Sequence, residues 1–162
     1  MRVKNSFGQT YVNEGSLLQL DSTKYKVDGT RSFYLFDVVP MGAPRMSSSD
    51  KWKTNPHHVD PKKRQREVVT RYFAYKNILQ LQANMMKFQL GEYLDVVFFV
   101  PIPDSFSEKK KALINGTPCK TKPDTDNYIK GICDIFKKED GDVWFIKAEK
   151  RWAYNGSILI YK

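Results

Sequence analysis

The chain has 162 residues, of which 41% are hydrophobic and 14% aromatic, so it is too apolar for a disordered chain and long enough to bury a core. Its 27 Lys and Arg residues outnumber its 18 Asp and Glu residues, giving a formal net charge of +9. This excess favours a polyanion as partner, and a basic protein with no role on nucleic acid is the alternative.

The cysteines and the hydropathy pattern indicate the compartment. Cys119 and Cys133 fit no metal-ligand spacing, and we expect both to be reduced thiols. The chain contains no run of about 18 apolar residues and does not open on a charged and then apolar leader. We therefore expect a soluble, cytoplasmic protein that is neither secreted nor bound to a membrane.

Residues 1–31 are polar and poorly periodic, and the chain shows no internal repeat. Short apolar stretches such as residues 17–20 favour a hairpin or an arm that packs on a neighbour. We predict an N-terminal arm or hairpin of unknown role over residues 1–31, followed by one compact domain over residues 32–162.

Residues 32–39 are aromatic and β-branched and predict a strand. Residues 40–45 contain two prolines and a glycine and predict a loop, in which Arg45 by itself indicates only a plain surface arginine. Residues 47–58 read as a polar loop. His57 and His58 do not predict a zinc site, because the chain has no other histidine and neither cysteine is near in sequence.

A long helix is predicted to begin with Asp60 as cap and Pro61 in its first turn, and to run to about Phe88, where Gly91 closes it. Its expected inner face is Val68, Tyr72, Tyr75, Leu79, Gln82 and Met86. Several cations at its start oppose the helix dipole, so they contact either DNA phosphates or solvent; they are Lys62, Lys63, Arg64, Arg66 and Arg71.

Residues 93–102 predict a buried strand that prolines end, and residues 105–111 begin with a capping pattern typical of a short helix. Residues 115–118 then turn the chain back. Five lysines of this region approach the aspartates described next, and they either grip a DNA backbone or form a solvated loop; they are Lys109, Lys110, Lys111, Lys120 and Lys122.

The most informative stretch is residues 122–130, Lys-Pro-Asp-Thr-Asp-Asn-Tyr-Ile-Lys. It predicts a helix entry with short polar caps, and an apolar stripe follows at helical spacing through Phe136. Asp126 and Lys130 are four residues apart and share a face, which Asp134 continues one turn further.

Asp124 precedes this helix and Asp140 follows it, so we expect Asp124, Asp126 and Asp140 to gather at one end of the element beside a lysine. Carboxylates that close repel one another, and oxygen ligands of this kind suit Mg²⁺. Two alternatives compete. One is a capped surface helix with an ordinary Asp–Lys pair. The other is a calcium loop, although the stretch lacks the glycine and distal glutamate of an EF-hand.

Residues 142–153 and 157–161 predict two strands, and Tyr154-Asn155-Gly156 between them is typical of a hairpin turn. The predicted order is strand, long helix, strand, loop, helix and hairpin. It indicates an α/β (α+β) fold, with a mixed sheet and two main helices on one side.

The stretch from Lys122 to Asp134, the acidic turn Glu-Asp-Gly-Asp at residues 139–142 and the strand containing Glu149-Lys150-Arg151 together resemble the RusA family of Holliday-junction resolvases. The resemblance covers residues 32–162. It implies that Asp124, Asp126 and Asp140 bind metal and that Lys130 is catalytic. The family favours a pair of aspartates in the acidic turn, which leaves Asp142 as a substitute; Asp140 keeps the spacing to the following strand.

The resemblance further implies a Mg²⁺-dependent endodeoxyribonuclease, with Mn²⁺ as a possible replacement, that resolves Holliday junctions by paired symmetrical nicks. It implies a homodimer of phage or prophage type, acting in DNA recombination and repair in the cytoplasm of a bacterial host cell. The expected DNA-binding residues are Arg45, Lys109, Lys110, Lys111, Lys120, Lys122, Lys150 and Arg151. A nuclease acting more broadly on flaps and forks, and an inactive DNA-binding module on the same scaffold, are the alternatives.

Overall fold

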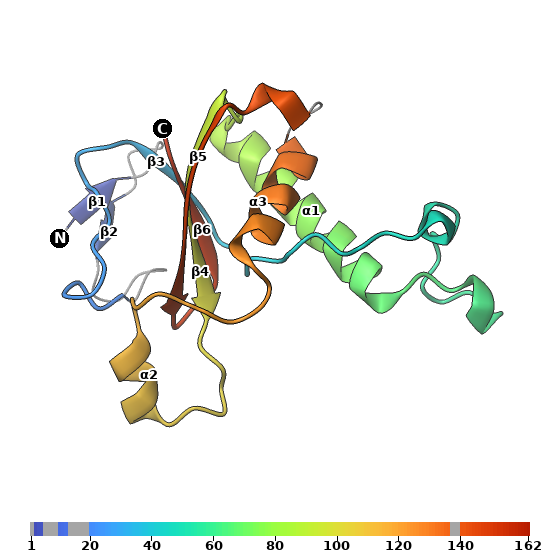
Figure 1. Cartoon of the computed structure of the whole chain (residues 1–162), viewed down its shortest axis with the longest axis horizontal. Helices are drawn as coiled ribbons and strands as arrows, with labels where there is room; N and C mark the ends of the chain where they lie inside the picture. The colour runs from blue at the N-terminus through green and yellow to red at the C-terminus, as the bar shows by residue number, and fades with distance from the viewer. Residues whose placement is uncertain (1, 5–9, 13–19, 137–139) are drawn as a thin grey trace.

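The computed structural model describes residues 2–4, 10–12, 20–136 and 140–162 (Figure 1). Its strands are β1 (Arg2–Lys4), β2 (Thr10–Val12), β3 (Phe33–Phe36), β4 (Tyr93–Pro101), β5 (Phe145–Ala153) and β6 (Ser157–Tyr161). Its α-helices are α1 (Glu67–Met86), α2 (Glu108–Ile114) and α3 (Thr125–Phe136). Short 3₁₀ turns cover Ser48–Lys51, Pro61–Lys63 and Asp140–Asp142. Residues 17–19, which were expected to belong to an N-terminal hairpin or arm, lie outside the described part of the chain.

Four strands form a mixed sheet in the order β3-β6-β4-β5. Strand β4 is antiparallel to β6 and parallel to β5, and β3 is antiparallel to β6. Because β4 has a strand on each side and a layer on each face, its residues from Leu94 to Phe99 are all buried. The run is apolar except for Asp95, and such buried apolar runs are typical of central strands. The predicted α+β class and mixed sheet are confirmed.

The predicted hairpin between β5 and β6 is wrong, because β4 lies between these two strands. The physical reason is the order strand, helix, strand in β4, α3 and β5. Such a crossover places its two strands parallel, often as neighbours, and β6 then takes the free side of β4.

Gly156 serves close packing in this connection. A Cβ atom at this position would lie 2.8 Å from the Cα atom of Val39. Gly156 is buried, and among the described glycines only Gly116 has a positive φ, at 82°. The absence of a side chain therefore lets the backbone of Val39 approach closely. Gly156 was expected to form a hairpin turn, but its role in the structure is this close packing.

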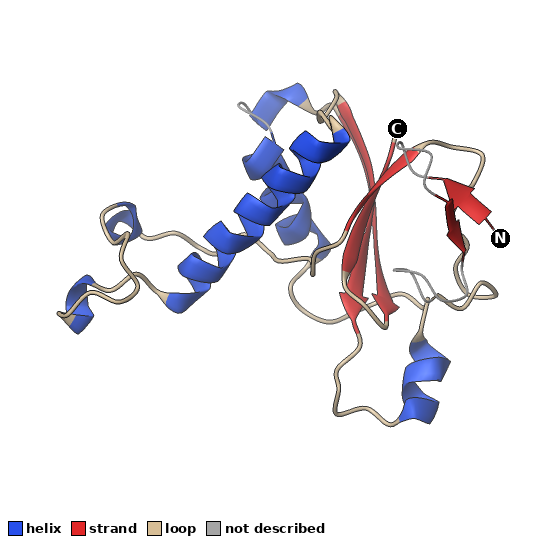
Figure 2. Cartoon of the chain, turned by 180° about the vertical axis from the view of Figure 1, so that it is seen from behind, coloured by secondary structure: helices blue, strands red, loops and turns tan. Residues whose placement is uncertain are grey.

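Helices α1 and α3 lie together on one face of the sheet (Figures 1 and 2). Phe98 of β4 stacks on Tyr128 of α3, with ring centroids 5.1 Å apart. Phe88 meets both Phe36 and Phe136 edge-on, at 5.3 and 5.2 Å. These aromatic contacts fix α3, and with it the residues at its start, against the sheet.

The ends of the long helix differ from the prediction. Asp60 does cap a turn, since its carboxylate accepts from the Lys62 N–H at 2.9 Å, but that turn is 3₁₀ and stops at Lys63. Arg64 and Arg66 are extended, so α1 begins only at Glu67. At the other end Lys87, with φ of 53°, forms the left-handed cap in place of Gly91.

The inner face of α1 is Val69, Tyr72, Tyr75, Leu79 and Ala83. Val69 and Ala83 replace the predicted Val68 and Gln82. The Gln82 side chain instead accepts from the Asp37 N–H at 2.8 Å and donates to the Asp37 carbonyl at 3.0 Å. It thereby satisfies the backbone where β3 ends, which explains a polar residue beside the apolar stripe.

The second face of the sheet is covered by residues 20–31. Leu20 and Val27 are buried there against Phe33, Phe99 and Leu159. The Arg31 guanidinium donates to the Asp95 carboxylate at 2.6 Å and lies over the Tyr161 ring. Strands β1 and β2 pair antiparallel as a separate two-stranded sheet. In the described part of the chain, no helix has the length and apolar character needed to cross a membrane.

Candidate active site

The start of α3 carries the predicted aspartates. The Asp124 carbonyl accepts from the Asn127 N–H at 3.1 Å, so the helix begins immediately after it. The preceding Lys122–Pro123 peptide bond is cis. The Lys150 ammonium donates to the carbonyls of Thr121 and Pro123, the latter at 2.6 Å. Strand β5 therefore holds the loop that presents Asp124.

Three aspartates and a lysine, from α3 and the residue before it, line one open cleft of about 540 Å³. The side chains of Asp124, Asp126 and Lys130 are exposed to solvent, as is that of Asp134, which also borders the cleft. The opposite wall comes from the loop after β3 and includes Arg45. The helix and the residue before it thus present three carboxylates and a cation to the same solvent-filled space.

The loop after β3 packs closely on α3. The Ala43 N–H donates to the Asn127 carbonyl at 3.4 Å. A Cβ atom at Gly42 would lie 3.0 Å from the Asn127 side chain, and one at Gly131 would lie 3.3 Å from the Met41 carbonyl oxygen. The two glycines allow this approach, which places Arg45 at the rim of the cleft.

The charges in the cleft are not neutralised pairwise. Within the described residues, the Lys130 ammonium forms no ion pair with Asp126, although the two share a helix face. Burial raises the pKa of Tyr72 on α1, and the nearby carboxylate of Asp134 raises it further. The carboxylates of the cleft can accept a divalent cation, and the Lys130 ammonium can pair with phosphate oxygens. The cleft therefore suits a phosphate ligand that binds together with a metal ion.

The third predicted carboxylate belongs to a different end of α3. The 3₁₀ turn Asp140–Asp142 follows the C-terminal end of the helix, whereas Asp124 and Asp126 stand at its N-terminal end (Figure 1). The side chain of Asp140 lies outside the described residues, and that of Asp142 is exposed. Among the side chains that the structure describes, no group of three His, Cys, Asp or Glu residues is placed to hold a metal ion.

Apart from Arg45 at the rim of the cleft, the predicted DNA-binding residues fall into two groups. Lys109, Lys120 and Lys122 are exposed, and within the described residues no ion pair involves them. The others make contacts within the chain: Lys110 over the Phe106 ring, Lys111 with Glu108, Lys150 with the loop before α3, and Arg151 with Glu149 and the Gly116 carbonyl.

Sequence reasoning missed the role of Asn127 and the residues around it. Asn127 lines the cleft and its backbone carbonyl receives the Ala43 N–H. It also missed that Lys150 supports the loop before α3. The only sequence signal for the contact of Asn127 was the Pro/Gly segment at residues 40–44. The contact of Lys150 with Pro123 had no signal, since the two residues are 27 positions apart.

Comparison with known proteins supplies the family. The model of the endodeoxyribonuclease RusA family matches residues 37–161, which is most of the chain and includes the whole cleft. The chain belongs to the RusA family. It is accordingly an endodeoxyribonuclease, of a family that resolves Holliday junctions and acts on branched DNA. Among curated proteins and among solved structures, none matches the chain.

Proposed function

We propose that this RusA-family chain is a Mg²⁺-dependent endonuclease that resolves four-way DNA junctions by two symmetrical nicks. The observation that carries the proposal is the cleft in which Asp124, Asp126 and Lys130 face the same open space. Two carboxylates beside a free ammonium match what phosphodiester hydrolysis requires, namely ligands for a hard cation and a positive charge for the phosphate.

The donor set fits a hard divalent cation. Asp124 and Asp126 offer exposed carboxylate oxygens in a cleft that is open to solvent, and Mg²⁺ is commonly held by one or two carboxylates together with substrate phosphate. Mn²⁺ accepts the same ligands. When bound, such a metal lowers the pKa of a coordinated water and neutralises charge on the scissile phosphate.

Asp140, with Asp142 as substitute, is the third ligand of this proposal, and we assign it to a second copy of the chain. Helix α3 has 12 residues and so spans about 18 Å, which separates the turn at 140–142 from Asp124 and Asp126 at the start of the helix. A homodimer with a two-fold axis would bring each turn to the partner's cleft. It would also supply the two sites that paired nicks need.

Exposed apolar residues next to that turn support self-association. Trp144 is 76% exposed, and Phe145 and Ile146 at the start of β5 are also exposed. Residues 116–119 bond to the second half of β5, with the Cys119 N–H donating to the Lys150 carbonyl at 2.8 Å. Within the described residues, no strand pairs with the outer edge of the first half. An apolar, unpaired strand edge favours a second copy.

Lys130 acts in this proposal as a point charge. Its ammonium stabilises the negative charge that builds on the phosphate, or on the leaving 3′-oxygen, without ligating the metal. Arg45 at the rim contacts an adjacent phosphate. Further from the cleft, the DNA backbone is bound by Lys109, Lys110, Lys111, Lys120 and Lys122. Lys150 and Arg151 lie beside the DNA backbone as well.

We further propose residues 32–162 as the nuclease unit and residues 1–31 as an added N-terminal arm. The family match begins at residue 37, which supports this division. The enzyme would act in DNA recombination and repair in the cytoplasm of a bacterial host, as a phage or prophage protein, because its substrate forms there.

The first experiment replaces Asp126 by Asn. Cleavage of a synthetic four-way junction in Mg²⁺ should fall by about 10³-fold or more, while binding in EDTA is kept or tightens slightly because one negative charge is removed. Asp104→Asn, which removes an exposed carboxylate from a loop outside the cleft, is the matched control and should cut at the normal rate. Cleavage by Asp126→Asn within about tenfold of wild type would exclude Asp126 from the site.

A mixing experiment tests the shared site. Chains carrying Asp126→Asn and chains carrying Asp140→Asn should each be inactive alone. If the third carboxylate comes from the partner, a mixed dimer keeps one intact site and regains single-strand nicking. No recovery from a mixture of proven mixed dimers would place the third ligand in the same chain.

Substrate comparison separates the remaining possibilities. A resolvase nicks a mobile four-way junction in symmetrical pairs and leaves linear duplex and forks largely uncut. A broader nuclease cuts forks and flaps equally well, and a binding module retards the junction but cuts nothing in Mg²⁺. Binding should weaken by about 0.9 log units per log unit of salt for each phosphate contacted.

A further inference from the structure

Residues 44–66, which we call the arm, extend away from the sheet between the loop after β3 and the start of α1 (Figures 1 and 2). By sequence the arm holds seven cationic residues and two carboxylates, the cations being Arg45, Lys51, Lys53, Lys62, Lys63, Arg64 and Arg66. It therefore supplies more than half of the chain's net charge of +9.

Hydrogen bonds give the arm a defined shape. The Asp50 carboxylate accepts from the Arg66 guanidinium at 2.5 and 3.0 Å and from the Ser47 N–H and hydroxyl at 2.7 and 2.8 Å, and its side chain is only 3% exposed. Further along, the Arg64 guanidinium donates to the His58 carbonyl at 2.7 Å. The fold of the arm thus uses both of its carboxylates, since Asp60 caps the turn at Pro61.

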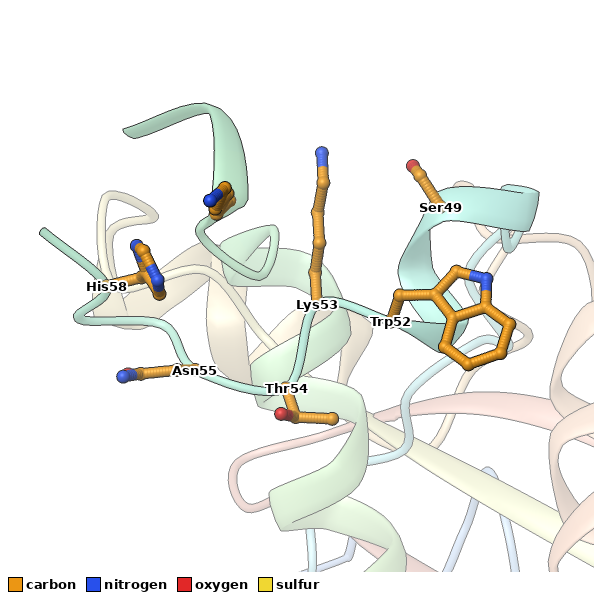
Figure 3. A pocket seen from close by; sticks show the side chains of 7 residues that line it. Ser49, Trp52, Lys53, Thr54, Asn55 and His58 are labelled. Carbon is orange, nitrogen blue, oxygen red and sulfur yellow. The ribbon is translucent and has the colours of Figure 1, made fainter. Parts of the chain in front are cut away.

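The arm presents an indole to solvent beside a hollow. The Trp52 side chain is 85% exposed, although tryptophan is usually among the best-buried side chains. Next to it lies a pocket of about 360 Å³ whose lining includes Ser49, Trp52, Lys53, Asn55, His58 and Lys63. Figure 3 shows Lys53 extending outwards between Trp52 and His58. A flat aromatic face and two ammonium groups therefore border one space.

This combination suits a nucleotide whose base is unstacked. Aromatic side chains bind such bases face to face, and neighbouring cations take the phosphates on either side. Trp52 and Lys53 supply these two contacts from adjacent positions, and Lys63 reaches the pocket from the turn at Pro61. Asn55 and Ser49 offer hydrogen-bond partners for the edges of a base.

The arm is physically joined to the cleft. Arg66 donates both to Asp50 inside the arm and to the Arg45 carbonyl at 2.9 Å, and Arg45 lines the cleft with Asp124 and Asp126. A DNA strand that passes through the cleft therefore has the arm as its neighbour. At a branch point the stack of base pairs is interrupted, so a base can be unstacked there at lower cost than inside a uniform duplex.

We propose that the arm binds an unstacked nucleotide of branched DNA, with its base on Trp52 and its phosphates on Lys53 and Lys63. This inference deepens the proposed function and depends on it. It assigns recognition of the branch point to Trp52, Lys53 and Lys63, which line a pocket separate from the cleft of Asp124 and Asp126. The arm would hold the opened strand beside the cleft and so select branched DNA over uniform duplex.

The test measures junction binding in EDTA, so that the intact chain binds without cutting. Trp52→Ala should weaken binding of a four-way junction by about 5- to 150-fold, the range for a single base-stacking aromatic, with a much smaller loss on linear duplex. Trp52→Phe should restore most of the loss because a phenyl ring still stacks. Val59→Ala removes a 92% exposed apolar side chain of the same arm outside the pocket and should bind normally.

A photocrosslink locates the contact directly. 5-Iodouracil placed at the branch point should crosslink to a peptide containing residue 52 in the wild-type chain and not in Trp52→Ala. If the wild-type chain cuts junctions but Trp52→Ala binds within about twofold and the crosslink maps elsewhere, the proposal for the arm fails and the proposed function stands. If the wild-type chain binds no branched DNA, both fail.

Discussion

The start of α3 and the arm carry the two proposed contacts with DNA, yet they are stabilised in opposite ways. Helix α3 is fixed by apolar packing, with Tyr128 stacked on Phe98 and Ile132 fully buried. The arm has little apolar burial and depends on the hydrogen-bonded pair of Asp50 and Arg66. Apolar packing of α3 fixes the positions of Asp124 and Asp126, which the proposed binding of a metal ion requires. The arm is held by hydrogen bonds and can therefore open locally without unfolding the sheet.

The largest expected effect comes from breaking the packed region. Phe98→Ala should lower the free energy of unfolding by about 3–5 kcal/mol, because it removes a fully buried ring and the platform on which Tyr128 lies. Urea denaturation followed by circular dichroism measures the change. Phe73→Ala, at a partly exposed aromatic on α1, is the control, and it should cost much less. Equal losses for the two variants would contradict the assignment of the core.

A smaller effect is expected where the packed sheet holds the cleft. Lys150→Met should lower cleavage by about tenfold, since the carbonyls of Thr121 and Pro123 lose the ammonium that restrains the loop before Asp124. The slope of junction binding against salt should stay unchanged if this restraint is the main role of Lys150. Lys26→Ala, at an exposed lysine on the other side of the sheet, is the control. A slope reduced by about one phosphate contact would instead indicate direct DNA binding.

The smallest effect concerns the arm and depends on pH. Hydrogen bonds from the Arg66 guanidinium, and then from the Ser47 N–H, hold the pKa of Asp50 below its usual 3.8. A lowered pKa in the folded state stabilises the fold at pH values above 3.8, and this stabilisation is lost as the pH falls below that value. The free energy of opening the arm should therefore be higher in wild type than in Asp50→Asn by a constant amount at pH 5–7, and this difference should shrink in more acidic solution.

Trypsin digestion shows whether this loss is local. At neutral pH, Asp50→Asn should be cut faster at the lysines and arginines of the arm, while the urea midpoint of the remaining protein changes little. If the variant instead unfolds as a whole in a single step, the arm and the packed region form one cooperative unit.

The sequence predicted the strands well because their apolar runs are long and local. The stretch of residues 93–102 became β4, and the capping pattern with Ser107 became α2, in which the Ser107 hydroxyl accepts from the Lys110 N–H. The prediction failed for α1, whose start was placed at Asp60. A local cap was present there, but Arg66 is drawn into the pair with Asp50 and delays the helix to Glu67.

The same division applies to the candidate site. The spacing of Asp126, Lys130 and Asp134 was sufficient to predict that they share one face, because a helix places residues four apart on the same side. The opposite wall of the cleft was not predictable, since Arg45 arrives through a loop that packs on Gly131 and Asn127 nearly 90 residues later. The roles of these residues as ligands and catalyst stay predictions.

The amino-acid sequence by itself determined the elements, the acidic helix start and the family resemblance, because these depend on residues close together in the chain. Only the tertiary structure decided that β4 separates β5 from β6, that the turn at 140–142 follows the opposite end of α3 from Asp124 and Asp126, and that Trp52 stands exposed on a charged arm. The physical reason is that strand neighbours, helix length in space and burial follow from how distant segments pack, and local patterns carry no record of that packing.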